Sequence, residues 1–100
     1  MKKTLEEIKR ILNEQEPYLK QKYGVLTVGV FGSYSRDEAN DNSDLDILIE
    51  FDEIRKIGLL EFISIENYLS DILGIKVDLV EKSALKPRLG RRILEEVIYP

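Results

Sequence analysis

The sequence contains no cysteine and no histidine, and these two absences exclude several kinds of chemistry. Without cysteine there are no disulfides, no thiolate nucleophiles and no zinc–thiolate sites. Without histidine the chain has neither the usual general base nor the commonest transition-metal ligand. A bound metal must therefore be a hard cation with oxygen ligands, such as Mg²⁺, Mn²⁺ or Ca²⁺. A proton acceptor must be a carboxylate, a lysine, a tyrosine or water.

Long apolar runs are also missing, so no segment is expected to cross a membrane as a helix. The first seven residues lack the apolar core of a secretory signal, and a cytoplasmic location is the expectation. A length of 100 residues with 43% hydrophobic and 34% charged residues is typical of one small globular domain. We therefore expect a single domain over residues 1–100.

Charges of opposite sign are segregated along the chain, whose net charge is −4. Every charged residue in 37–53 is acidic, and every charged residue in 82–92 is basic. The acidic segment would repel a nucleic-acid backbone in the absence of metal ions, so direct nucleic-acid binding is not expected. The basic segment is compatible with contacts to phosphates or to an acidic partner, and equally with a solvated helix face.

The spacing of apolar residues predicts an α/β fold. Helical spacing predicts a helix over 3–22, which Pro17 is expected to break or kink. Strands are predicted over 25–31, 44–51 and 75–80, with a turn at 32–33 and a loop at 40–43. A second long helix is predicted over 58–73, ended by Gly74, and a last one starts at Pro87. In this last helix we expect four side chains to point inward: Leu89, Ile93, Leu94 and Val97.

The lengths of the connections predict the topology of the sheet. The short link between the first two strands favours an antiparallel pair. The helix between the second and third strands permits a parallel, right-handed connection. A small three-stranded mixed sheet flanked by helices results, in which parts of all three strands can converge on one place.

Three aspartates on the predicted strands are candidate metal ligands. Asp44 and Asp46 are two residues apart, so their side chains leave the same face, with Cα atoms about 6.5–7 Å apart at about 3.3 Å rise per residue. Such carboxylates can share one divalent cation or a pair of them, although a solvated edge strand is an equally good explanation of the pair alone. Asp78 points away from its apolar neighbours and reaches the same metals if the third strand lies beside the second; the alternative is an aspartate of an edge strand that faces water.

A turn after the first strand is a candidate phosphate site. A strand that runs into Gly32-Ser33 at a helix start presents free backbone N–H groups, which suit a phosphate. Gly32 would let the backbone approach closely, Ser33 adds a hydroxyl, and Arg36 adds a positive charge. Ser33 could also be a simple N-cap. The segment is not a P-loop, because no Gly-Lys-Ser/Thr follows.

Taken together, these motifs resemble the signature of the DNA polymerase beta-like nucleotidyltransferase superfamily. They are Gly32-Ser33, Arg36, Ser43-Asp44-Leu45-Asp46 and Asp78. The spacing and length are most similar to the minimal nucleotidyltransferases of that superfamily, and the resemblance covers nearly the whole chain. It implies the polymerase beta-like nucleotidyltransferase fold. Many relatives have Ala-Arg-Gly where this chain has Ser35-Arg36-Asp37, so the loop after Ser33 is expected to differ.

The resemblance also implies a function. Members of the family are commonly paired with a small helical HEPN-domain toxin and act as its antitoxin, and some transfer AMP from ATP to a tyrosine of that toxin. On this chain it implies a Mg²⁺-dependent protein adenylyltransferase with two ions, Mn²⁺ being the alternative metal. Asp44 and Asp46 would hold the ions. Asp78 would complete the metal site and help activate the acceptor hydroxyl. Gly32 and Ser33 would bind the outer phosphates, with Arg36 supporting that loop or its charge.

The expected partners are therefore ATP and a HEPN-domain toxin that docks over the site. Candidate residues for this contact are Arg88, Arg91 and Arg92 with Tyr99, and packing of the last helix is the competing explanation. Two other functions stay open: transfer to a small molecule or nucleic acid, and an antitoxin that neutralises by binding without catalysis. The sequence also leaves open whether Asp78 is a base or only a ligand, and whether the chain forms homo- or hetero-oligomers.

Overall fold

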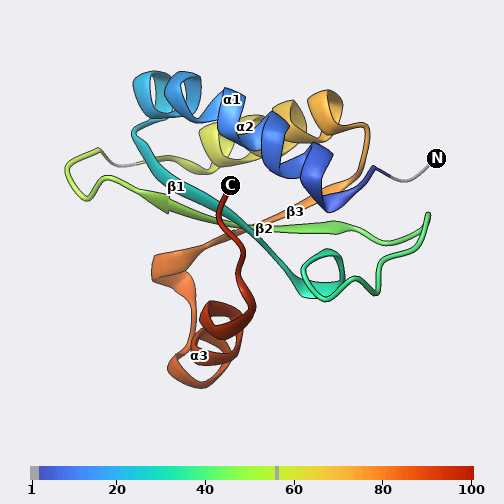
Figure 1. Ribbon diagram of the computed structural model, residues 1–100. Helices are drawn as coiled ribbons and strands as arrows, with labels where there is room; N and C mark the ends of the chain where they lie inside the picture. The colour runs from blue at the N-terminus through green and yellow to red at the C-terminus, as the bar shows by residue number, and fades with distance from the viewer. Residues whose placement is uncertain (1–2, 56) are drawn as a thin grey trace.

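The computed structural model describes residues 3–55 and 57–100; residues 1–2, which begin the N-terminal stretch discussed above, and residue 56 lie outside it. Helices α1 and α2 cover one face of a sheet, and the shorter helix α3 lies against the other face (Figure 1). The order along the chain is α1 (Leu5–Tyr23), β1 (Val25–Phe31), β2 (Leu45–Phe51), α2 (Leu59–Leu73), β3 (Val77–Glu81) and α3 (Pro87–Glu96). Short 3₁₀ turns follow β1 at Gly32–Tyr34 and β3 at Lys82–Ala84.

The sheet has the strand order β1-β2-β3, with β1 antiparallel and β3 parallel to β2. This confirms the predicted three-stranded mixed sheet. In the register of the strands, Phe31 is the partner of Asp46, and Asp46 is the partner of Asp78. One residue from each strand therefore lies in a single row across the sheet, and two of the three are acidic.

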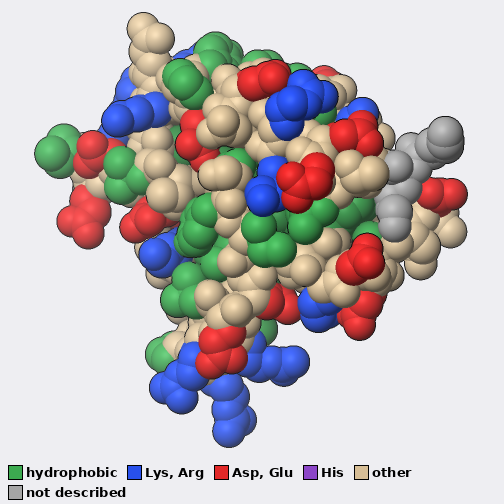
Figure 2. Space-filling model, viewed as in Figure 1, with side chains coloured by type: hydrophobic (Ala, Val, Ile, Leu, Met, Phe, Trp, Pro, Cys, Tyr) green, Lys and Arg blue, Asp and Glu red, His purple; other side chains and the backbone are tan. Residues whose placement is uncertain are grey.

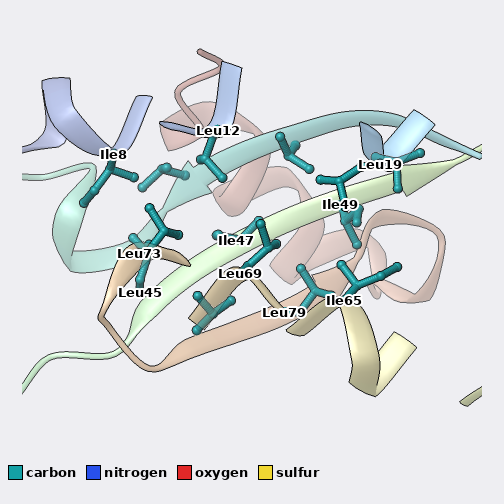
Figure 3. Close-up of a cluster of buried hydrophobic side chains, with 14 of the residues drawn as sticks. Ile8, Leu12, Leu19, Leu45, Ile47, Ile49, Ile65, Leu69, Leu73 and Leu79 are labelled. Carbon is teal, nitrogen blue, oxygen red and sulfur yellow. The ribbon is translucent and has the colours of Figure 1, made fainter. Parts of the chain in front are cut away.

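The core lies between the sheet and the helices α1 and α2. Side chains alternate along β2, so that Leu45, Ile47 and Ile49 face these helices while Leu48 packs with Phe31 and Ile93 on the other face. Figure 3 shows this interior, formed by Ile8, Leu12, Leu19, Leu45, Ile47, Ile49, Ile65, Leu69, Leu73 and Leu79. Each fully buried side chain of this size contributes about 1.5–3 kcal/mol. Asp46 alternates with Leu45 and Ile47, so its side chain is on the other face of the sheet, the face toward α3.

Helix α1 begins at a capping box and continues through Pro17. The Glu7 N–H donates to the Thr4 hydroxyl at 3.2 Å, and the Thr4 N–H donates to the Glu7 carboxylate at 3.2 Å. Pro17 removes one backbone hydrogen bond, but Leu12 and Leu19 on either side of it are completely buried and hold the helix on the sheet. Of the two expected effects of Pro17, a break or a kink, the break is therefore wrong.

Helix α3 contacts the sheet through a narrow stripe. Ile93 is buried and Val97, just beyond the helix, is partly buried, as expected. The prediction that Leu89 and Leu94 point inward is wrong, because these side chains are 54% and 45% exposed. Only one stripe of α3 faces the sheet, and Leu89 instead lines a cleft between the helix and the sheet. None of the helices in the described parts of the chain is long and apolar enough to span a membrane.

The outer edges of the sheet are covered by other parts of the chain. On β3 the Leu79 N–H donates to the Glu66 carboxylate at 2.9 Å, and the Val77 N–H donates to the Ser70 hydroxyl at 3.0 Å. On β1, Val30 exchanges two backbone hydrogen bonds of 2.8 and 2.9 Å with Ile98. These contacts satisfy edge groups that would otherwise be open to another strand. They also fix the residues after α3 against β1.

Candidate active site

Asp46 and Asp78 lie side by side on the sheet face that α3 covers. They are register partners on neighbouring parallel strands, whose backbones are about 4.8 Å apart. Both line a cleft of about 550 Å³ between the sheet and α3. The other charged side chains of this cleft are Arg36, Arg92, Glu95 and Glu96, and its apolar wall includes Leu85 and Leu89. The predicted approach of Asp78 to Asp46 is therefore found.

The carboxyl group of Asp46 is destabilised in its charged form. Partial burial is the main cause, and the negative charges of Asp78 and Asp44 add to it, so that the pKa of Asp46 rises from 3.8 to about 6. Arg36 opposes this shift only in part. A carboxylate that is both desolvated and repelled by its neighbours favours a bound cation. The electrostatics of the cleft therefore suit a positive ion between the aspartates.

Gly32 brings the backbone directly against Asp46. It follows β1 with a φ of 75°, in the left-handed region where a side chain is unfavourable. A Cβ atom at this position would collide with the Asp46 carboxylate. The sequence argument expected Gly32 to permit close approach of the backbone to a phosphate, whereas the group that the backbone approaches in the structure is the Asp46 carboxylate, a candidate metal ligand.

Glu96 is a site residue that the sequence did not indicate. Its carboxylate accepts the Gly32 N–H at 3.1 Å and the Arg36 guanidinium at 2.8 Å, and Arg36 also binds Glu38 at 2.6 Å. Burial by itself would raise the pKa of Glu96, but the hydrogen bonds from Arg36 and Gly32 outweigh it and hold that pKa below its ordinary value. Arg36 is therefore tied to two carboxylates, that of Glu96 in the cleft and that of Glu38 two residues further along the chain.

Asp44 and Ser33 lie outside this cleft. β2 begins at Leu45, so Asp44 precedes the strand, is exposed and lines a neighbouring hollow with Ser43 and Lys76. Among the described residues, no three acidic side chains gather closely enough to form a ready metal site. Ser33 lies half-buried in the 3₁₀ turn, and its hydroxyl has no hydrogen-bond partner in the described parts of the chain. The structure thus joins Gly32, Arg36, Asp46 and Asp78, with Asp44 and Ser33 at the margin.

The basic residues of the last helix are on the surface. Arg88, Arg91 and Arg92 are all exposed, and Tyr99 is 43% exposed. Figure 2 shows a concentration of Lys and Arg side chains over α3, where it projects from the molecule. Packing in the core therefore does not explain these arginines. Arg92 also lines the cleft that contains Asp46 and Asp78.

Comparison with known proteins shows the family. The model of the nucleotidyltransferase domain matches residues 5–100. Protein adenylyltransferase MntA of Thermococcus cleftensis is 50% identical over 96 residues, which cover 96% of this chain and 95% of that protein. A solved structure described as a candidate minimal nucleotidyltransferase is 36% identical and has a TM-score of 0.78. The match covers 96% of this chain and 95% of that one. The chain therefore belongs to the nucleotidyltransferase domain family, and its fold is that of the minimal nucleotidyltransferases.

Two more distant structures share the fold. One is a toxin–antitoxin complex with AMP-PNP, with a TM-score of 0.72 and 21% identity over 88% of this chain and 70% of that one. The other is the tri-AMPylated HEPN toxin of Shewanella oneidensis in complex with an MNT antitoxin, with a TM-score of 0.64 and 17% identity over 91% of this chain and 70% of that one. At this identity the similarity shows the fold alone. The family and fold inferred from the sequence motifs are thus confirmed.

Proposed function

We propose that this chain is a Mg²⁺-dependent protein adenylyltransferase that transfers AMP from ATP to a tyrosine of a partner HEPN-domain toxin and so neutralises it. The observation that carries the proposal is the pair Asp46 and Asp78, which faces one cleft beside Gly32. The similarity to a protein adenylyltransferase over nearly the whole chain supports AMP transfer to a protein. The expectation of a HEPN partner comes from the family resemblance.

The donor set fits a hard divalent cation. The candidate ligands are carboxylates, and the raised pKa of Asp46 reflects a repulsion that a cation would remove. Magnesium is commonly held by one or two carboxylates together with waters and substrate phosphates, so Asp46 and Asp78 suffice as a nucleus for the site. Asp44, exposed two residues before Asp46, completes the ligand set. Two ions, when bound, would neutralise the triphosphate and align the attacking and leaving oxygens, and Mn²⁺ would substitute for Mg²⁺.

The loop after β1 binds the outer phosphates of ATP. Gly32 keeps the backbone next to Asp46, which brings the phosphates and the carboxylates to one place. The Ser33 hydroxyl, which no described residue engages, donates a hydrogen bond to a phosphate oxygen. Arg36 adds a positive charge next to this loop, and Arg92 adds another from α3. Both partly offset the negative charge that ATP brings to an acidic cleft.

The reaction is a displacement at the α-phosphorus. The phenolic oxygen of the acceptor tyrosine forms a bond to the α-phosphorus, the bond to the bridging oxygen of the β-phosphate breaks, and pyrophosphate leaves. Asp78 is exposed at the cleft, and its carboxylate accepts the phenolic proton. The exposed basic residues Arg88 and Arg91 are on α3, next in sequence to the cleft residues Leu89 and Arg92, and are candidates to contact the protein that carries the tyrosine.

The test is a transfer assay with the protein encoded by the neighbouring gene, which the proposal expects to be a small helical protein. The wild-type protein, labelled ATP and Mg²⁺ should label that partner, and the double variant Asp44→Asn/Asp46→Asn should not. Glu14→Gln is the matched control, because Glu14 is an exposed carboxylate on α1 whose one ion pair with the described residues is with Arg10, at 3.2 Å. If the wild-type protein transfers nothing while the double variant still suppresses toxicity, neutralisation is by binding and the enzymatic account is refuted.

A further inference from the structure

The carboxylate of Glu96 joins the end of α3 to both ends of the turn after β1. One oxygen accepts the Gly32 N–H at 3.1 Å, and the other accepts Arg36 Nη1 at 2.8 Å. These partners are 64 and 60 residues away in the sequence, so the contact exists only in the folded chain. Glu96 also lines the cleft that holds Asp46 and Asp78. A single side chain thus holds the segment from Gly32 to Arg36 at its first and last residues.

In the observed geometry only a carboxylate satisfies both contacts, because each donor meets a different oxygen of Glu96. The Gly32 N–H and the Arg36 guanidinium are both donors, and an ionised carboxylate offers two acceptor oxygens. The isosteric amide of glutamine offers one acceptor, and its NH₂ group would face whichever donor is left over. Hydrogen bonds with an ionised partner are also shorter and stronger than neutral ones. Glu96 therefore has a chemical role that its closest analogue cannot reproduce.

The backbone that carries Glu96 is fixed on both sides. Three residues earlier, Ile93 is 6% exposed and packs with Phe31 and Leu48 on the sheet. Two residues later, Ile98 exchanges two backbone hydrogen bonds with Val30 in β1. Because both anchors rest on β1 or its neighbour β2, the Glu96 carboxylate has a defined position relative to the strand that leads into Gly32.

We infer that Glu96 is a positioning residue for nucleotide binding, which holds the Gly32–Arg36 turn in the shape that receives the ATP phosphates. This inference rests on the proposed function. Glu96 takes up the Gly32 N–H, so the phosphate is left to the Ser33 hydroxyl and to the guanidinium N–H groups of Arg36 that Glu96 and Glu38 do not use. It also keeps Gly32 against the Asp46 carboxylate, so that the phosphate-binding and acidic parts of the site stay in register.

The test compares Glu96→Gln and Glu96→Asp with the wild-type protein and the control Glu14→Gln, using AMP transfer at varied ATP concentration. Glu96→Gln should lower kcat/KM by about 10- to 100-fold, as expected for losing a charge-assisted hydrogen bond and leaving a donor unpaired, with a clear rise in KM for ATP. Glu96→Asp keeps two acceptor oxygens on a shorter side chain and should recover part of the loss. A merely structural role would reduce the amount of active enzyme and leave KM unchanged.

A second measurement, independent of catalysis, is hydrogen exchange of the Gly32 amide by NMR, which should be slow in the wild-type protein and in Glu14→Gln and fast in Glu96→Gln. If the wild-type enzyme is active and the KM for ATP is unchanged in Glu96→Gln, the positioning role alone is overturned. A lower KM in that variant would also overturn it, because it would show that Glu96 competes with the phosphates. Absence of AMP transfer by the wild-type protein would instead refute the proposed function, and the positioning role with it, whereas the amide exchange would still report the contact.

Discussion

Replacing Asp46 by asparagine should make the metal-free protein more stable at neutral and alkaline pH. The pKa of Asp46 is raised in the folded protein from 3.8 to about 6, first by burial and then by the charges of Asp78 and Asp44. A carboxyl group with a raised pKa holds its proton more tightly in the folded than in the unfolded state. Its contribution to stability is therefore complete below pH 3.8 and is lost as the pH rises through about 6. Above that pH the ionised side chain destabilises the fold, and asparagine removes this cost.

The size of the effect follows from the same pKa. Each pKa unit corresponds to about 1.4 kcal/mol, so a rise from 3.8 to about 6 sets an upper limit of about 3 kcal/mol. Asp46 is only partly buried, and solvent screening reduces this limit, so we expect about 1–2 kcal/mol. In a chain of this size, 1 kcal/mol shifts Tm by about 4–8 °C.

The assay is thermal unfolding in EDTA at pH 8 and at pH 3.5, with Asp46→Asn, the wild-type protein and the surface control Asp71→Asn. Asp46→Asn should melt about 5–10 °C above the wild-type protein at pH 8, and the difference should largely vanish at pH 3.5. Asp71 is exposed on α2, so its variant should stay within about 0.5 kcal/mol of the wild-type protein at both pH values. An Asp46→Asn protein that melts no higher than the wild-type protein at pH 8 would refute the claim that this carboxylate is destabilised by its surroundings.

Three further outcomes are expected. Gly32→Ala should abolish AMP transfer and lower Tm strongly. Gly74 has a similar φ of 67° but no neighbouring atom within 4 Å, so Gly74→Ala should lose only about 1–2 kcal/mol of stability to backbone strain and remain active. Equal effects of the two substitutions in both assays would contradict the contact with the Asp46 carboxylate. Glu66→Ala should lower the free energy of unfolding in urea by about 1–3 kcal/mol, because the Leu79 N–H at the sheet edge loses its acceptor. An unchanged unfolding midpoint would show that this hydrogen bond is dispensable. Asp78→Asn should lower the transfer rate by at least about 100-fold but weaken Mg²⁺–ATP binding only in part, because Asp44 and Asp46 remain as ligands. A fall in rate no larger than the loss of Mg²⁺–ATP binding measured by calorimetry would show that Asp78 acts only as a ligand.

The sequence was sufficient for the sheet and for the aspartate pair on it. The mainly apolar run after Gly24 locates β1 at Val25–Phe31 without error, and the second strand differs from its predicted start by a single residue. The third strand, predicted over 75–80, is β3 at Val77–Glu81. The meeting of Asp46 and Asp78 was predictable because a helical connection favours a parallel pair, and parity then places both side chains on one face. These are properties of local pattern and strand order, which a single sequence contains.

The faces of the helices and the role of Glu96 were not predictable in the same way. Leu89 and Leu94 have the apolar character of core residues, but the contact between α3 and the sheet is narrow, and the buried residues of the helix are Gly90 and Ile93. Glu96 follows a run of arginines and looks like an ordinary helix-end carboxylate. Its partners Gly32 and Arg36 are brought to it only by the packing of α3 and by the pairing of the following residues with β1.

The most direct test of AMP transfer is to ask which phosphate of ATP becomes attached to the partner. ATP labelled at the α-phosphate should label the helical partner protein, and the label should map to a tyrosine by mass spectrometry. ATP labelled at the γ-phosphate should leave the partner unlabelled, because displacement at the α-phosphorus releases the β- and γ-phosphates as pyrophosphate. Label from the γ-phosphate, or label from neither position with an active toxin partner present, would contradict the account.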